Sequence, residues 1–113
     1  MSVLKRRLES LTDEMTKQSC YQKYQELLKK IQEDGETYHR LNEYRRRNVA
    51  LHWEQGGLRE EAVLKQEYHD LLHDRQIQEF LFWEQETLQM MQMIHQQVND
   101  ALSLDDSFLS EGM

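Results

Sequence analysis

Apolar residues recur every three or four positions along most of the chain, the spacing that gathers them on one face of an α-helix. The first such stripe is formed by Leu4, Leu8, Leu11 and Met15, with charged residues on the opposite side. It predicts a short amphipathic helix over residues 3–16. Because the pattern continues beyond this helix, we expect two longer helical arms to follow.

The first arm covers residues 19–55. Its apolar positions are Tyr24, Leu27, Leu28, Ile31, Tyr38, Leu41 and Val49. Ser19 and Gln22 match the S-x-x-Q capping box that starts a helix. Asp34 and Gly35 interrupt the stripe, and glycine suits the left-handed turn that closes many helices. We therefore predict two helices in near continuation, with a bend at Asp34 and Gly35.

The second arm covers residues 58–104 and is separated from the first by Gly56-Gly57, the clearest break in the sequence. Helices joined by so short a loop usually lie antiparallel. Within this arm, Asp74 is placed to begin a new helix. The last apolar stripe predicts a helix over residues 76–103, roughly 42 Å long at 1.5 Å per residue.

Length and composition agree with one all-α domain over residues 1–113. The chain contains no proline and four glycines, which favours uninterrupted helix. The predicted fold is an antiparallel helical hairpin or bundle of long, bent amphipathic helices, with the short helix at its N-terminal side. Residues 105–113 have no sustained period, so we expect them to fray or to dock as a short clip.

The apolar surface of the second arm exceeds what one facing helix covers. Phe80, Phe82 and Trp83 point in several directions around their helix, so contacts are needed on more than one side. A second copy of the chain is the economical cover, since two-fold pairing is the commonest assembly. We therefore expect a homodimer. The predicted contact residues are Phe80, Trp83, Leu88, Met91, Ile94 and Val98.

The formal net charge of −7 is unevenly spread. Residues 1–50 hold 11 Lys and Arg against 8 Asp and Glu, and residues 51–113 hold 3 against 13, so the two halves carry +3 and −10. Both halves also carry apolar stripes that need a partner surface. We therefore expect the halves to lie beside each other and to neutralise each other's charge.

The alternative for the basic half is nucleic-acid binding through Arg45, Arg46 and Arg47, the densest positive run. Three consecutive arginines spread over three sides of a helix and so do not form one stripe. The net charge opposes binding to a polyanion, and no aromatic ladder for bases is evident. Nucleic acid is therefore not the partner that we expect.

A second alternative, a metal-dependent hydrolase, comes from the stretch HDLLHD at residues 69–74. His69 and His73 stand four apart, as in the H-E-x-x-H signature of zinc peptidases. That chemistry needs a glutamate as general base and a third ligand. Here the acid is Asp70, and no third ligand follows a recognisable pattern. We expect a solvated polar face above buried Leu71 and Leu72 instead.

Cys20 is the one cysteine, so no intrachain disulfide forms, and we expect a half-buried structural thiol. The first ten residues lack the apolar stretch of a signal peptide, and no run of about 18 apolar residues suggests a membrane span. We therefore expect a cytoplasmic protein. The Met-rich residues 88–97 suit either core and dimer packing or an adaptable partner-binding surface.

The pattern of the two arms resembles the YlbF/YmcA family of small all-helical bacterial proteins. The resemblance is carried by SCYQKYQELLKKIQEDGETYHRLNEYRRRN at residues 19–48 and by VLKQEYHDLLHDRQIQEFLFWEQETLQMMQMIHQQVNDAL at residues 63–102. The shared features are a bend near an aspartate, a helix with a Tyr-Arg pair, a glycine-containing loop and a long final amphipathic helix. Together they cover most of the chain.

The resemblance implies a dimeric helical bundle without enzymatic activity, linked to the control of competence, sporulation and biofilm formation. It also implies a link to RNA processing, since two members join a third protein in an iron–sulfur complex that assists an mRNA-cleaving ribonuclease. The cluster-binding relatives have cysteines near the C-terminus, whereas residues 103–113 here contain none. Cys20 alone cannot hold a cluster, which typically needs four ligands. We therefore expect no cofactor.

Overall fold

The computed structural model describes residues 2–54 and 56–102, and every regular element in these ranges is an α-helix. The elements are α1 (Ser2–Thr16), α2 (Ser19–Gln32), α3 (Gly35–Trp53), α4 (Leu58–Glu67), α5 (His69–Leu72) and α6 (Arg75–Leu102). The predicted all-α fold is confirmed. The predicted behaviour of residues 105–113 lies outside the described residues.

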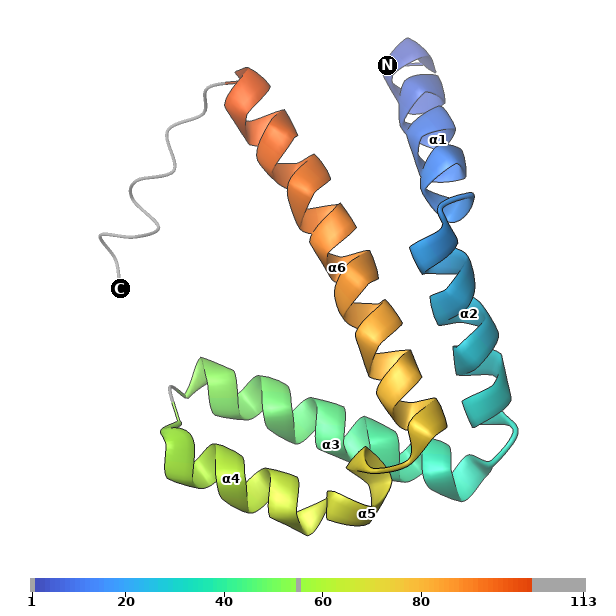
Figure 1. Cartoon of the computed structure of the whole chain (residues 1–113). Helices are drawn as coiled ribbons and strands as arrows, with labels where there is room; N and C mark the ends of the chain where they lie inside the picture. The colour runs from blue at the N-terminus through green and yellow to red at the C-terminus, as the bar shows by residue number, and fades with distance from the viewer. Residues whose placement is uncertain (1, 55, 103–113) are drawn as a thin grey trace.

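Both predicted arms are bent, and they pair along their lengths as two antiparallel helix pairs (Figure 1). Helix α2 runs against α6 in the most extensive contact of the chain, and α3 runs against α4 and α5. The chain turns sharply between α2 and α3, so the prediction of near continuation was wrong. The radius of gyration is 17.7 Å, against about 13 Å for a compact domain of about 100 residues.

The sharp turn is set by Asp34 and not by a glycine cap. The Asp34 carboxylate accepts hydrogen bonds from the backbone N–H of Thr37 at 3.3 Å and from its hydroxyl at 2.8 Å. These bonds hold the pKa of Asp34 below its ordinary value. Gly35 is the first residue of α3 and does not adopt the left-handed conformation that was predicted for it. The bend was placed correctly, but its cause is an N-cap.

The predicted starts of α2 and α6 hold to within one residue, although the mechanism at α2 differs. Helix α2 begins at Ser19 as predicted, but Gln18 is its N-cap residue and no side chain caps it, so Ser19 and Gln22 form no capping box. Asp74 does cap α6, since its carboxylate accepts from the backbone N–H groups of Gln76 at 2.9 Å and Ile77 at 3.2 Å.

The predicted break at Gly56-Gly57 is confirmed and has a steric reason. The Gly56 N–H donates to the carbonyl of Leu51 at 2.8 Å, which folds the chain back on the end of α3. A Cβ at Gly56 would lie 2.2 Å from Leu51 Cδ1, so a side chain there would force Leu51 to move. The close approach of the chain therefore favours glycine at this position.

The hydrophobic core lies where the two helix pairs meet. Its buried members are Leu27, Ile31, Leu41, Tyr44, Leu64, Tyr68, Leu71, Ile77 and Phe80. Phe80 is 0% exposed and stacks on Tyr24 with ring centroids 5.4 Å apart. Phe80 therefore belongs to the core of its own chain, and the prediction that it contacts a second copy is corrected. Helix α1, in contrast, contributes no buried residue.

Candidate functional site

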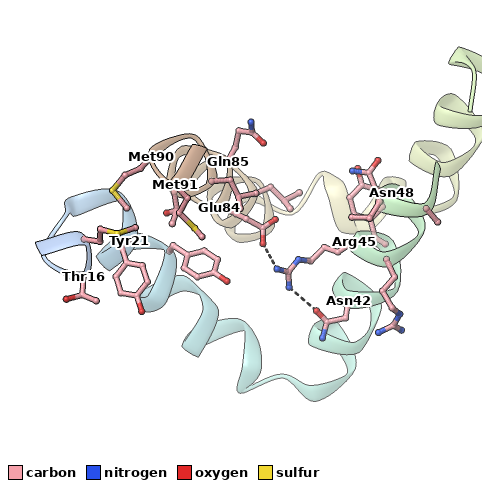
Figure 2. Close-up of a pocket in the computed structure, with 18 of the residues that line it drawn as sticks. Thr16, Tyr21, Asn42, Arg45, Asn48, Glu84, Gln85, Met90 and Met91 are labelled. Carbon is pink, nitrogen blue, oxygen red and sulfur yellow. Dashed lines mark hydrogen bonds and ion pairs between the residues drawn. The ribbon is translucent and has the colours of Figure 1, made fainter. Parts of the chain in front are cut away.

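A groove of about 940 Å³ opens between α1, α2, α3 and α6 (Figure 2). Its walls are mainly apolar and aromatic, with Met15, Tyr21, Tyr24, Leu81, Leu88 and Met91 among the lining residues. We call this feature the apolar groove. It exists because the α1–α2 and α6 helices diverge above the core while α3 crosses below them (Figure 1).

One ion pair stands on the α3 and α6 sides of the apolar groove. Arg45 Nη2 donates to Glu84 Oε2, and Arg45 Nη1 donates to Asn42 Oδ1 at 3.0 Å (Figure 2). The Arg45 guanidinium also lies 5.4 Å from the ring centroid of Phe80. Burial raises the pKa of Glu84, and the positive charge of Arg45 opposes this rise. The charges of Arg45 and Glu84 therefore compensate each other at the edge of the apolar walls.

The other arginines of the predicted positive run do not share one surface. Arg47 Nη1 lies 2.7 Å from Glu67 Oε1, and its guanidinium sits 5.5 Å from the ring centroid of Tyr68. Arg46 is exposed and lines the apolar groove. With Arg45 and Arg47 both paired to acidic residues of the second half, the predicted neutralisation between the halves is confirmed. Two of the three arginines that the nucleic-acid alternative requires are thus already engaged in ion pairs within the chain.

The HDLLHD stretch has a structural explanation for its acidic residues. Asp70 forms a two-bond ion pair with Arg40, with N···O distances of 2.8 and 3.0 Å, and this pairing lowers the pKa of Asp70 to about 2. Asp74 caps α6. Leu71 is buried, as predicted, whereas Leu72 is only half-buried. Both acids of the stretch are thus engaged in holding helices in place.

The two histidines of the stretch lie together on the surface. The rings of His69 and His73 are exposed and stack with centroids 3.9 Å apart. His73 Nδ1 hydrogen-bonds the carbonyl oxygen of His69 at 2.8 Å. Within residues 2–54 and 56–102, no group of three His, Cys, Asp or Glu side chains is placed to hold a metal ion. The stretch therefore offers a histidine pair without the further ligand that a zinc site requires.

Beyond the apolar groove, α6 carries a row of partly exposed apolar residues. We call it the α6 stripe: Leu88, Met91, Val98 and Leu102. Leu88 and Met91 are 46% and 49% exposed, and they also line the groove, so the two surfaces are continuous. Of the other predicted contact residues, Ile94 is half-buried, and Trp83 packs against the core with its ring 4.9 Å from that of Phe82.

The groove itself was not predicted from the sequence, because its walls come from four helices. One signal could have pointed to it. Glu84 occupies the position between Leu81 and Leu88 where the spacing of the apolar stripe calls for a hydrophobic residue. A charge at such a position needs a partner, and Arg45 is that partner. Cys20 is half-buried, as expected, and lies outside the groove.

The fold and the groove define a small all-α protein with an apolar groove built across several helices. No described helix combines the length and hydropathy needed to cross a bilayer. The chain belongs to the family described as "Control of competence regulator ComK, YlbF/YmcA", whose model matches residues 4–103. The predicted family is confirmed, and its description is that of a regulatory family. No curated protein and no solved structure matches the chain.

Proposed function

We propose that this protein is a non-enzymatic, cytoplasmic adaptor that controls bacterial development, competence above all, through contacts with regulatory proteins. The observation that carries the proposal is the open apolar groove, which continues into the α6 stripe. An exposed apolar surface of this kind is typical of protein–protein contact sites. The family description supplies the regulatory setting, and the wider family resemblance extends the proposal to RNA processing.

We assign the two sides of the apolar groove different tasks. On the α6 side, the α6 stripe with Trp83 and Ile94 pairs with a second copy of the chain, giving a homodimer. On the α2 and α3 side, Tyr21 and Val49 receive the regulatory protein. Grooves lined by helices commonly accept the apolar face of an amphipathic helix. The methionines in the wall add a surface that adapts to more than one partner.

Replacing Val49 with aspartate tests the proposal. In a competent host that lacks its own copy of the gene, the Val49→Asp variant is expected to lose control of a ComK-dependent reporter, because a charge would enter the apolar groove. Val63→Asp is the matched control: Val63 is 57% exposed against 55% for Val49, and it lines a separate hollow between α3 and α4.

The proposed regulatory contact is wrong if the Val49→Asp variant restores reporter control as well as the wild type does. Loss of control in the Val63→Asp variant would also count against it, because the effect would then not be specific to the groove. Equal amounts of folded protein, measured by circular dichroism and immunoblot, are required in each strain.

A further inference from the structure

We propose that α1 is an intermolecular helix: the diverging α1 and α6 arms of two copies interlock, and α1 of one copy lies antiparallel to α1 of the second. This inference rests on the homodimer in the proposed function and goes beyond it by assigning α1, its orientation and its register. Four observations carry it: the isolation of α1, the positions of its apolar residues, its charge pattern and the neutrality of the facing part of α6.

Among the described residues, α1 has few partners within its own chain. Within residues 2–54 and 56–102, its backbone approaches only that of α2, and none of its residues is buried. Leu4 and Leu8 are 61% and 59% exposed. A helix of 15 residues is marginal in water without packing. The apolar residues of α1 therefore need a cover that the described part of the chain does not supply.

The apolar rows of α1 and α6 extend outward from the same groove. Met15, the last residue of the α1 row, lines the apolar groove together with Leu88 and Met91, the first residues of the α6 stripe. The α1 row steps by four, three and four residues, and the α6 stripe fits the same seven-residue repeat, as in helices that pair in bundles. From Leu88 to Leu102 the stripe spans 15 residues, equal in length to α1. Figure 1 shows the two arms diverging along this length.

The charge pattern of α1 does not stabilise the isolated helix, but it suits pairing with a second helix. Lys5, Arg6 and Arg7 lie near its N-terminus, whereas Glu9, Asp13 and Glu14 follow towards its C-terminus. This order opposes the helix dipole, which favours acids at the N-terminus and bases at the C-terminus. In an antiparallel pair of α1 helices, however, each basic end faces an acidic end. The pattern is thus self-complementary under a two-fold axis, which argues for a second copy as the occupant.

The part of α6 that would face the second copy also permits the two copies to come close together. Residues 87–99 contain no Asp, Glu, Lys or Arg, although the chain as a whole carries a charge of −7. Two copies of so acidic a chain would repel each other at most surfaces. Along this part of α6 that repulsion is weakest, because neither copy presents a charged side chain from the segment.

The repeat also fixes the register of the α1 pair. When Leu8 faces Leu11 of the second copy, Leu4 faces Met15 of the second copy, and every member of the row has an apolar partner. In the same register Arg7 lies opposite Glu14 of the second copy, at the flanking positions that set orientation in paired helices. Glu14 now lies 3.3 Å from Lys17 in an exposed pair, which contributes little and is readily exchanged.

Charge reversal in α1 tests the inference. The acidic variant carries Lys5→Glu, Arg6→Glu and Arg7→Glu, and the basic variant carries Glu9→Lys, Asp13→Lys and Glu14→Lys. Each variant places like charges at both ends of the α1 pair, so sedimentation is expected to show its dimer dissociation constant raised at least about tenfold. Each set of changes agrees with the helix dipole but adds like-charge neighbours within α1, so recovery in a mixture of the two variants is needed to identify the contact between copies.

An equimolar mixture of the two variants is expected to recover the wild-type affinity, because the acidic α1 of one chain then faces the basic α1 of the other. A chain with all six changes is expected to dimerise by itself, since self-complementarity is restored with the opposite polarity. The inference is overturned if either single set dimerises as tightly as the wild type, or if the mixture remains monomeric.

A Leu88→Asp/Met91→Asp variant distinguishes a wrong role for α1 from a wrong assignment of the homodimer contact on α6. If that variant is monomeric while the α1 variants dimerise normally, the dimer stands and the role of α1 is wrong. If the wild type is itself monomeric, both the proposed α6 contact and the inference about α1 fail. If the α6 variant still dimerises, the proposed α6 contact fails and the charge-reversal variants alone decide the role of α1. The contact at Val49 is tested independently of these results.

Discussion

At the scale of single residues, the pairing of Arg45 with Glu84 connects the two helix pairs. Arg45 belongs to α3 and Glu84 to α6, and both side chains are largely shielded from solvent beside the core residue Phe80. Burial disfavours the ionised form of Glu84, so the carboxylate depends on the arginine. The neighbouring Arg46 is exposed and is not shielded beside the core as Arg45 is. Three adjacent arginines thus contribute very differently to the fold.

Arg45→Met is expected to reduce the free energy of unfolding at neutral pH by about 2 kcal/mol, since Glu84 is left without its cation. The same change at Arg46 is expected to alter it by less than about 0.5 kcal/mol. The deficit of the Arg45→Met variant should shrink as the pH falls towards the ordinary Glu84 pKa of 4.5, because protonation removes the unpaired charge. Urea denaturation across this pH range measures both effects, and equal losses at the two arginines would contradict the assignment.

At the scale of elements, α6 has two different environments along its length. Its first part carries Ile77 and Phe80 into the core, whereas its later part carries the half-exposed α6 stripe. The change occurs because α2 packs against the first part of α6, where Arg45 of α3 also reaches Glu84, and the arms diverge beyond it (Figure 1). One continuous helix therefore anchors the fold at one end and presents an apolar surface at the other.

Phe80→Ala and Phe82→Ala compare the buried and exposed faces of the first part of α6, within one turn of the helix. Phe80 is 0% exposed, so its truncation is expected to cost about 3–5 kcal/mol of unfolding free energy through lost burial and an internal cavity. Phe82 is 55% exposed, and its truncation should cost less than about 1 kcal/mol. Both are read from urea denaturation at a single protein concentration. Similar costs for the two residues would mean that Phe80 does not belong to the core.

At the scale of the whole molecule, the single chain is open. Its principal extents are 47, 37 and 18 Å, and the α1 helix extends from the core without burying a residue. A chain of this length buries a modest share of its surface even when compact, so an unsupported arm is costly to keep ordered. Assembly with a second copy would support α1 and would also bury the exposed apolar rows.

Dilution of the wild type through its dimer–monomer transition is expected to melt α1. The helical circular dichroism signal should fall by about one sixth, the share that the 15 residues of α1 contribute to the described helices. The core helices should keep their signal, because their packing is intramolecular. An unchanged signal across the transition, followed in parallel by sedimentation, would show that α1 needs no second copy to remain folded.

The sequence alone determined the class of fold and most of the helix boundaries. The spacing of apolar residues, the glycine pair at residues 56 and 57 and the aspartate at position 74 are local features, and local hydrogen bonding and sterics decide where a helix starts and stops. The family was also within reach of the sequence, because its pattern extends over most of the chain.

Tertiary structure alone decided which neighbour covers each face. Periodicity could not distinguish Phe80 in the core from Phe82 at the surface, nor predict that Asp70 would pair with Arg40 and Glu84 with Arg45. It placed a bend after α2 but not the sharpness of that turn, which brings four helices around the apolar groove. The physical reason is that a repeat of 3.6 residues fixes the direction of a side chain relative to its own helix axis, whereas its burial and its partners depend on how distant helices cross.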